Sequence, residues 1–398
     1  MAITINSSPS AYQSINDKNW WVVTSTNTSE TNFKYVCDIY VASNLVARLK
    51  SFPNPNNNKG IFDVANVIKN YLANYFLVGS GTYDIAYDTS NIYVSYEVKF
   101  GEEYGGTTYL NLTTATKTAY NYIADLMSSV AYFNATQYDD YPTQFKFLTK
   151  RDLLSLKTTR SASKLFIPFL SPTQNVSADY QIWIDTYSNG TQINTDTGDE
   201  LMLTDLAQFD FSISAINEYV GYELITSSID AYVIRLILNE TEVQQAKVTI
   251  VCESKFTPIP LHFLNSLGGY ETMVFDLVNK QNRSLEKKSF EQYEWEYNSS
   301  STSMDRTNQY GVLNGGSKTF WNQQSVTYHL ISDYVTLTDY TWLRDLLMSP
   351  EVYTEINGVI VPVTMTTNTW NEKKRYTDKV YNLELDIELA SKVNGQAR

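Results

Sequence analysis

The sequence predicts a mainly β, multi-domain protein with short helices and with β-sandwiches of the immunoglobulin or fibronectin type III kind. Short segments that alternate apolar and polar residues recur along the chain and are separated by polar turns. Tyrosine is frequent, with 31 copies, and both tyrosine and threonine favour pleated surfaces. A chain of 398 residues exceeds what one hydrophobic core usually serves, so we expect several domains.

The first predicted domain covers residues 1–106 and is a β-sandwich-like domain with one capping helix. Apolar residues recur at helical spacing over residues 63–76, directly after a Pro- and Asn-rich break at 53–60. The short turn at 42–44 makes a hairpin of the strands on either side of it. The expected strands are 20–24, 33–41, 45–52, 83–87 and 93–100.

Two further regions follow. The pattern weakens over residues 107–175, which we expect to be a linker or an extended arm with a short helix near 122–127 and isolated strands at 145–151 and 153–158. Residues 176–257 are predicted to form a fibronectin type III-like β-sandwich, because short strands with polar turns return there. These strands are expected at 180–187, 210–215, 222–225, 232–238 and 247–253.

The last predicted domain covers residues 258–398 and is a β domain with a short helix. Strands are expected at 261–264, 273–277 and 359–364, and a polar loop at 298–309. Trp342, Leu343, Leu346 and Leu347 have helical spacing, and Pro350 ends that helix. In the final strand, 381–389, alternation directs Leu383, Leu385, Ile387 and Leu389 towards a core and Glu384, Asp386 and Glu388 outward.

Charge and cysteine content limit the classes of function. The net charge of −13 argues against nucleic-acid specificity. No segment reaches the roughly 20 apolar residues that a membrane span needs, and the first ten residues lack a signal-peptide pattern, so we expect synthesis in a cytoplasm and no membrane span. Cys37 and Cys252 lie in predicted strands; one disulfide stays open, but two buried free thiols are favoured.

Little in the sequence points to catalysis. Only His262 and His329 are present, each in an apolar-rich strand where a hydrogen-bonded or surface-facing histidine is favoured. Residues 311–319 resemble a phosphate-binding loop, but Ser317 separates the second glycine from Lys318, and no helical pattern follows. A hairpin turn is therefore the favoured interpretation of this segment.

Carboxylate groups are the remaining candidates for chemistry. Glu102–Glu103 and Asp139–Asp140 are expected in loops, and residues at alternate positions of one strand lie about 6.6 Å apart, so Glu384, Asp386 and Glu388 could hold a hard cation. The favoured alternative is a solvated strand face whose negative charge is balanced by basic residues of the preceding segment, in the same chain or in a neighbouring subunit. Those residues are Lys373, Lys374, Arg375 and Lys379. We predict no catalytic, cofactor-binding or metal-binding residue, and no cofactor.

Three blocks of sequence carry a resemblance to a known family. The first runs from Asn19-Trp20-Trp21-Val22-Val23 through 32–35 and 47–50 to Gly60-Ile61-Phe62-Asp63-Val64. The second is 263–272 with Phe275 and 286–288, and the third is 346–350 with 361–363 and the terminal strand. Together they resemble tail-associated virion proteins of tailed bacteriophages that infect Bacteroidetes, including crAss-like phages. The resemblance implies a multi-domain β protein of a tail ring, hub or baseplate-like collar, and it implies no catalytic residue.

The expected function is therefore structural and not enzymatic. We expect a homo-oligomeric ring in the virion tail that connects other tail or portal-proximal proteins. The alternative is a tail fibre or adhesin that binds host surface glycans through tryptophan faces, although core packing is favoured for each candidate: Trp183, Trp295, Trp321 and Trp370. A third hypothesis is a polysaccharide-degrading enzyme with unrecognised carboxylates.

Overall fold

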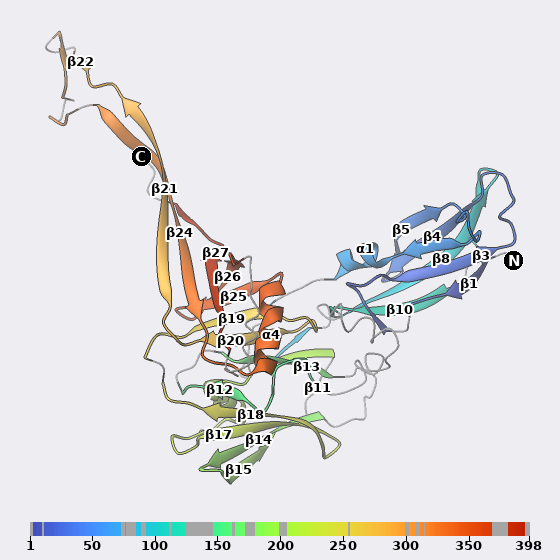
Figure 1. The fold of residues 1–398 in the computed structure, drawn as a ribbon, viewed down its shortest axis with the longest axis horizontal. Coiled ribbons are helices and arrows are strands. Elements are labelled where there is room, and N and C mark those ends of the chain that lie inside the picture. Colours follow the sequence, from blue (N-terminus) through green and yellow to red (C-terminus); the bar gives the residue numbers. More distant parts are fainter. Residues whose placement is uncertain are drawn as a thin grey trace. The chain divides into compact units, whose positions relative to one another are not determined.

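The structure is a computed structural model, and it confirms the predicted mainly β, multi-domain fold class (Figure 1). It describes residues 3–9, 12–72, 76, 85–88, 93–110, 114–123, 146–160, 164–171, 180–198, 205–253, 255–298, 302–307, 311–313, 315–367 and 381–394. The chain forms two compact units. The first unit contains Met1–Glu253, His262–Met273 and Thr341–Pro350, and the second contains Ser254–Leu261, Val274–Tyr340 and Glu351–Arg398.

The first unit begins with an N-terminal β-sandwich. One sheet has the order β1 (Ile3–Ser7), β3 (Trp20–Ser25), β6 (Gly60–Asp63). The other has the order β2 (Tyr12–Ser14), β10 (Thr114–Tyr120), β8 (Tyr93–Tyr104), β4 (Lys34–Val41), β5 (Asn44–Ser51), with β9 (Thr107–Tyr109) paired to β8. Trp21, Val23 and Phe62 of the first sheet share a buried core with Tyr35, Cys37 and Val98 of the second, and this shared core makes the two sheets a sandwich.

The helix predicted at 63–76 is shorter than expected. Helix α1 (Ala65–Ile68) continues only as the 3₁₀ turn η1 (Lys69–Tyr71), and Leu72 is already extended. The N-cap residue Val64 supplies no side-chain hydrogen bond to the free amides of the first turn. A helix of this length derives its stability from packing, here through the buried Ala65 and Ile68.

A second β-sandwich completes most of the first unit. Its sheets have the orders β11 (Lys146–Phe147), β13 (Phe166–Ser171), β16 (Asp205–Asp210), β7 (Ile85–Asp88) and β12 (Leu156–Thr158), β18 (Thr241–Ile250), β17 (Ala231–Leu238), β14 (Tyr180–Ser188), β15 (Thr191–Thr197). Phe169 and Phe209 of the first sheet share one core with Ile184 and Ile234 of the second. Helix α3 (Ile213–Val220) adds Ile216 to that core.

The predicted domain boundaries differ from these sheets in two places. Strand β10 pairs with β8, and β11, β12 and β13 belong to the second sandwich, so the described parts of residues 107–175 are mostly sheet strands rather than a linker. Strand β7, expected in the N-terminal domain, pairs instead with β16. Strand partners far apart in sequence are set by tertiary contacts that local alternation does not encode.

The strands predicted at 210–215 and 222–225 are also wrong, because helix α3 occupies the second half of the first segment and the second follows the helix without forming a strand. Ser212 caps the helix, its hydroxyl accepting a hydrogen bond from the Ala215 amide at 3.4 Å, and Gly221 ends it at a φ of 77°. A short apolar run does not distinguish a strand from a buried helix, which explains the error. The helix predicted near 122–127 falls mainly outside the described residues.

The largest sheet has the order β20 (Tyr270–Phe275), β19 (Ile259–Leu264), β25 (Val352–Ile356), β26 (Val359–Met365), β27 (Glu384–Leu389), β24 (Gly316–Ile331), β21 (Lys280–Gln292). Strand β28 (Val393–Asn394) also pairs with β24. The division into two units falls within β19 and β20. Part of the predicted polar loop at 298–309 is instead a short hairpin of β22 (Glu296–Asn298) and β23 (Ser303–Asp305).

Two predictions for the C-terminal region are confirmed. Helix α4 (Leu337–Met348) ends before Pro350 and buries Trp342, Leu343 and Leu346. In the final strand, Leu383, Leu385 and Ile387 are buried, as alternation predicted, whereas Leu389 is only partly buried. Among the helices that the structure describes, none has the length and apolar character to cross a membrane.

Candidate functional site

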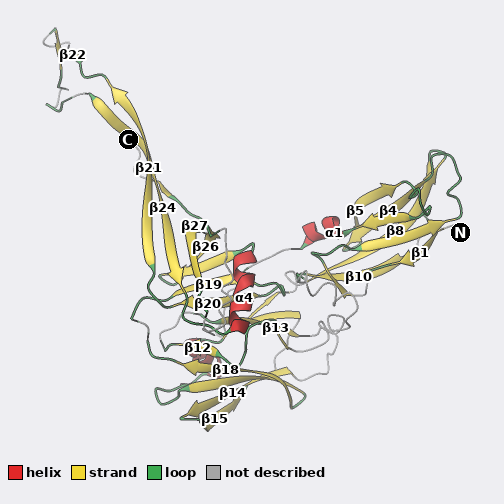
Figure 2. Cartoon of the chain, viewed as in Figure 1, coloured by secondary structure: helices red, strands yellow, loops and turns green. Residues whose placement is uncertain are grey.

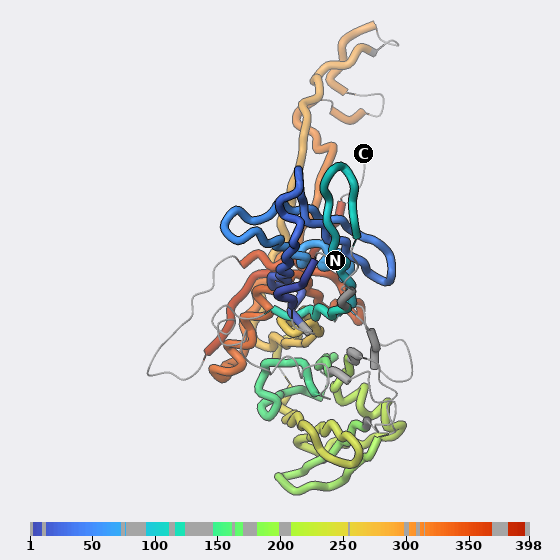
Figure 3. The backbone as a smooth tube through the Cα atoms, turned by 90° about the vertical axis from the view of Figure 1, so that its right-hand side faces the viewer, coloured from blue at the N-terminus to red at the C-terminus, as the bar shows by residue number. Residues whose placement is uncertain are grey.

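The second unit carries a long β-hairpin that extends beyond the rest of its sheet (Figure 2). We call β21, β24 and the β22–β23 hairpin between them the arm. Strands β21 and β24 pair from Lys280 with His329 to Gln292 with Gly316. Strand β27 pairs with β24 only from Thr327 onward, and β28 only at Gln323 and Gln324. Among the described residues, the segment of β24 from Gly316 to Asn322 pairs with β21 alone, so this distal part is a two-stranded ribbon, whose strands lie side by side in Figure 3 as well.

Large apolar side chains are exposed along the arm. Tyr293 is 91% exposed and Trp295 is 52% exposed. The others are Leu285, Phe290, Tyr297, Met304, Val312, Leu313 and Phe320. An isolated two-stranded hairpin is only marginally stable in water, and contiguous exposed apolar surface marks interaction sites. The arm is thus a candidate docking element.

Of the tryptophans singled out as glycan candidates, Trp295 is half exposed, so the favoured core-packing interpretation is wrong for it, whereas Trp183 and Trp321 are partly buried. Trp295 lies under Arg306, with the guanidinium carbon 5.4 Å from the ring centroid, and Trp321 lies under Lys288 at 4.7 Å. Trp183 is partly buried and donates a hydrogen bond to Gln181 at 2.7 Å. Trp370 lies outside the described residues.

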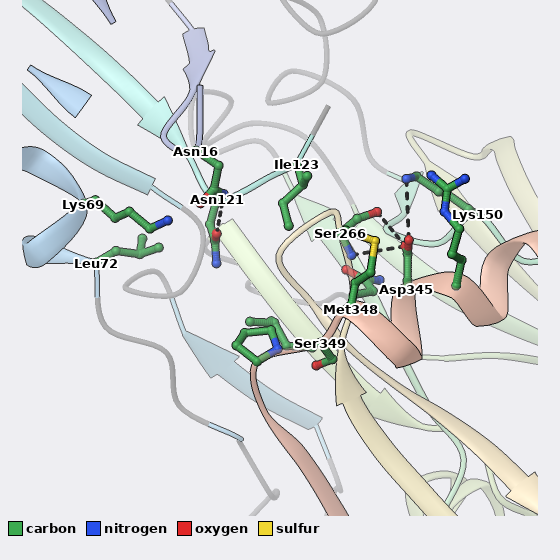
Figure 4. Close-up of a pocket in the computed structure, with 14 residues that line it drawn as sticks. Asn16, Lys69, Leu72, Asn121, Ile123, Lys150, Ser266, Asp345, Met348 and Ser349 are labelled. Atoms are coloured by element: carbon green, nitrogen blue, oxygen red, sulfur yellow. Dashed lines mark hydrogen bonds and ion pairs between the residues drawn. The ribbon is translucent and has the colours of Figure 1, made fainter. Parts of the chain in front are cut away.

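The first unit contains a pocket of about 610 Å³ (Figure 4). Its walls come from four regions far apart in sequence: the N-terminal sandwich with the segment that follows β10, the segment between β11 and β12, the end of β19 with the turn after it, and the C-terminal end of α4. The lining residues include three cations, Lys69, Lys150 and Arg344, and one carboxylate, Asp345. The apolar part of the lining includes Leu72, Ile123 and Met348. The pocket can therefore take a ligand that carries both negative charge and an apolar group.

Hydrogen bonds hold the pocket walls together. Ser266 donates to Asp345 Oδ2 from its backbone amide at 3.2 Å and from its hydroxyl at 2.5 Å, and Lys150 Nζ lies 3.8 Å from Asp345 Oδ1 (Figure 4). The Ile123 amide donates to the Ser266 carbonyl at 2.7 Å. The Asn16 side-chain amide donates to Asn121 Oδ1 at 3.3 Å. The polar lining is thus largely fixed before a ligand binds.

Behind the pocket lies a buried carboxylate, Glu271. Thr149 donates to its Oε2 at 3.0 Å, Trp342 Nε1 donates to the same oxygen at 2.5 Å, and Asn265 donates to Oε1. Burial raises the pKa of Glu271 to about 7, and Asp345 adds to this rise, whereas the Asn265 and Thr149 bonds act to lower it. Asn265 also lines the pocket, so the carboxylate adjoins the pocket wall.

His262 is the second buried titratable group in this region. His262 Nδ1 lies 2.8 Å from the Thr272 hydroxyl, which also accepts a hydrogen bond from the Phe166 amide at 2.9 Å. The imidazole stacks on Phe76 with 5.4 Å between ring centroids. Burial lowers the pKa of His262 to about 3, so the ring is neutral near pH 7. His262 is therefore a hydrogen-bonded histidine, which is one of the two roles that the sequence favoured.

The sequence did not single out Glu271, Asn265 or Asp345 as functional. A signal existed for Glu271, because an acidic residue stands inside the apolar strand Tyr270–Phe275, whose two faces are both mostly buried. Nothing local marked Asp345, which lies on a helix and meets Ser266 only in the folded chain.

Two basic residues lie beside the acidic face of β27 in the described part of the chain. His329 Nδ1 lies 2.8 Å from Asp386 Oδ1, and Lys392 lies 3.9 Å from Glu388. The predicted partners at 373–379 lie outside the described residues. Where the chain is described, no cluster of three or more histidine, cysteine or acidic side chains is arranged to hold a metal ion.

The loop predicted for the carboxylate pair Glu102–Glu103 is wrong. Glu102 and Glu103 lie in β8 and not in a loop. Glu102 is buried, accepting hydrogen bonds from Ser25 and from Asn27 at 3.0 Å, and Glu103 pairs with Lys50 at 2.5 Å. Both have structural partners within the sandwich. Asp139–Asp140 lies outside the described residues.

The structure also bears on the glycine-rich segment 311–319 and on the two cysteines. Strand β24 begins at Gly316 and contains Lys318, so no helix follows the glycines and the rejection of a phosphate-binding loop is confirmed. Cys37 and Cys252 are both free thiols, but only Cys37 is buried; Cys252 is exposed and lies beyond the end of β18. Burial raises the pKa of Cys37.

Comparison with protein-family models gives no match for this chain. Comparison with curated proteins gives none either.

Proposed function

We propose that this protein is a structural component of a bacteriophage tail, which assembles into a symmetric ring and connects neighbouring tail proteins. The observation that carries the proposal is the arm, a two-stranded ribbon with large apolar side chains left in water. The tail location is supported by the three blocks of sequence that resemble tail-associated virion proteins.

The stability of the arm depends on what it packs against. Strand β21 is exposed along nearly its whole length, so the distal ribbon gains little from packing within its own chain. Burial of apolar surface contributes about 25 cal/mol per Å², so docking against another copy would stabilise both the ribbon and the assembly. A protruding element that docks on a different surface of the next copy generates a closed ring when the rotation between copies closes.

Arm shortening tests this proposal. Because Lys288 and Trp321 are paired across the ribbon, residues 289–320 can be replaced by Asn-Gly, which forms a two-residue hairpin turn. We expect the full chain to form rings in light scattering and negative-stain micrographs, and the shortened chain to remain monomeric while keeping a β-type circular dichroism spectrum and a cooperative melting transition. As a control, Ile193→Ser removes an apolar residue on β15, outside the arm, that is 59% exposed. This variant should leave ring formation intact.

Two outcomes would overturn the proposal: a full chain that stays monomeric at high concentration, or a shortened chain that associates as well as the full one. Absence of the protein from purified tails would overturn the tail assignment separately.

A host-glycan-binding adhesin is the second candidate function, and the exposed Trp295 favours it. Its indole ring is half exposed and is held by Arg306, which is an arrangement suited to stacking on a sugar. Binding on a glycan array that is lost in Trp295→Ala would support this function. No signal above background would remove it.

A further inference from the structure

The distal end of the arm combines negative charge with aromatic surface. We call residues 290–298 and 302–307 the arm tip. Its charged residues are Glu291, Glu294, Glu296, Asp305 and Arg306, which leave a net charge of −3. Tyr293, Trp295 and Tyr297 are between half and almost fully exposed. Arg306 bridges the two kinds of group, because it lies over Trp295 and pairs with Glu294 at 2.8 Å.

The pocket in the first unit has the complementary chemistry. Among the described residues that line it, Lys69, Lys150 and Arg344 outweigh one carboxylate, Asp345, so these residues carry a net charge of +2 in a chain whose total charge is −13. Beside these cations lie the apolar side chains of Leu72, Ile123 and Met348. Opposite charge around an apolar centre is the arrangement that selects a partner and sets its register.

The size of the pocket fits an aromatic anchor. Its volume of about 610 Å³ lies within the range of roughly 300–1,000 Å³ that is usual for ligand pockets. Tryptophan and tyrosine are the residues that most often dominate binding energy when they fill such a pocket. The aromatic residues of the tip are available for this role because they are exposed in the single chain.

We infer that the pocket receives the arm tip of a second copy of this chain, with an aromatic ring of the tip against the apolar lining and its glutamates facing the pocket cations. This inference rests on the proposed function and names the contact that joins neighbouring copies. The tip and the pocket are different surfaces, so the contact is heterologous, and an open row of copies keeps one free tip at one end and one free pocket at the other until the ring closes.

Charge reversal tests the contact in the full chain. The tip variant is Glu291→Lys/Glu296→Lys and the pocket variant is Lys69→Glu/Lys150→Glu, with Lys69→Glu alone as a milder version because Lys69 is exposed on η1. Each variant by itself should associate on the order of tenfold or more weakly than the unaltered chain in analytical ultracentrifugation. An equimolar mixture of the two should recover association, because every tip then meets a pocket of opposite sign.

Matched controls exclude a general effect of surface charge. Lys247→Glu on β18 and Glu223→Lys after α3 reverse exposed charges outside the tip and the pocket, and both should associate normally. Circular dichroism and the melting temperature show whether each variant is folded.

The outcomes separate this inference from the proposed function. If a folded pocket variant associates normally while the shortened arm abolishes association, the arm docks elsewhere and the inference falls, although the ring proposal stands. If both reversals weaken association but the mixture recovers nothing, the two surfaces do not meet and the inference also falls. If the shortened arm still associates, the ring proposal itself fails.

Discussion

At the scale of single residues, two buried titratable groups with opposite pKa shifts lie on neighbouring strands. Burial holds Glu271 towards its protonated form and His262 towards its neutral form. Both shifts have the same cause, since a low-dielectric interior disfavours charge. Their effects on stability have opposite signs, so variants at each position are needed to separate them.

The first prediction concerns Glu271. Its pKa is about 7 in the folded chain and near its ordinary 4.5 when unfolded, so the folded state binds more protons between these values. Its contribution to the free energy of unfolding is therefore fully present below pH 4.5 and falls by about 3 kcal/mol as pH rises through 7.

The measurement is urea unfolding of the unaltered chain and of Glu271→Gln at several values between pH 5 and pH 8. The variant should be less stable at pH 5, because its amide group faces the donating Asn265 side chain, and its stability should change less with pH. Parallel pH profiles for the two proteins would contradict the assignment.

The second prediction concerns His262 and has the opposite sign. Its pKa is about 3 in the folded chain, below its ordinary 6.5, so the unfolded state binds more protons in this window. The contribution of His262 to the free energy of unfolding is fully present above pH 6.5. Acidification lowers it, by about 3 kcal/mol at pH 4.5. In His262→Asn the side-chain amide can still form a hydrogen bond with Thr272, so we expect lower stability at pH 7 but a smaller loss of stability on acidification in urea titrations. An unchanged loss on acidification would refute this.

At the scale of elements, the turn between β19 and β20 is built around two glycines in contact with other segments. Gly268 has a φ of 91°, and a Cβ there would lie 2.4 Å from the Asn121 carbonyl oxygen. A Cβ on Gly269 would lie 2.4 Å from Pro168 Cβ. The same turn supplies Asn265 and Ser266 to the pocket, so close backbone approach and pocket shape depend on each other.

The third prediction uses this close approach. Gly268→Ala should destabilise the chain by about 2 kcal/mol more than Gly190→Ala. The two positions share a positive φ, but a Cβ on Gly190 meets nothing within 4 Å. The control therefore reports backbone strain alone, and the difference in free energy of unfolding reports the collision with Asn121. Equal effects at the two positions would show that the turn can move away from Asn121.

At the scale of the whole molecule, charge is distributed unevenly over an acidic chain. The arm tip carries −3, and the pocket lining carries +2, within a total of −13. Salt screens both the general repulsion between acidic copies and the specific attraction between tip and pocket. Weaker repulsion raises the association constant, and weaker attraction lowers it.

The fourth prediction is that tip and pocket attraction dominates this balance. Raising the NaCl concentration should lower the association constant of the unaltered chain in analytical ultracentrifugation. The tip variant Glu291→Lys/Glu296→Lys lacks the specific attraction, so its weak association should not fall in the same way. An association constant that rises with salt in the unaltered chain would mean that apolar contacts and general repulsion control assembly.

Local pattern was enough to predict the mainly β class, many of the strands and the course of α4. Alternation placed Leu383, Leu385 and Ile387 in a core because successive side chains of a strand point to opposite faces. Helical spacing followed by Pro350 predicted where α4 stops. These features depend on residues that are near one another in the chain.

Which strands pair, and which polar groups become buried, depended on tertiary contacts. Strand β7 joins β16 across more than a hundred residues, and Glu271 meets Thr149 and Trp342 from two other segments. The spacing of residues gives the period of a strand but not its partner, and burial of a carboxylate depends on everything packed around it. For this reason the chain's strands could be read from its residues, whereas the pocket and the exposed arm became visible only in the folded molecule.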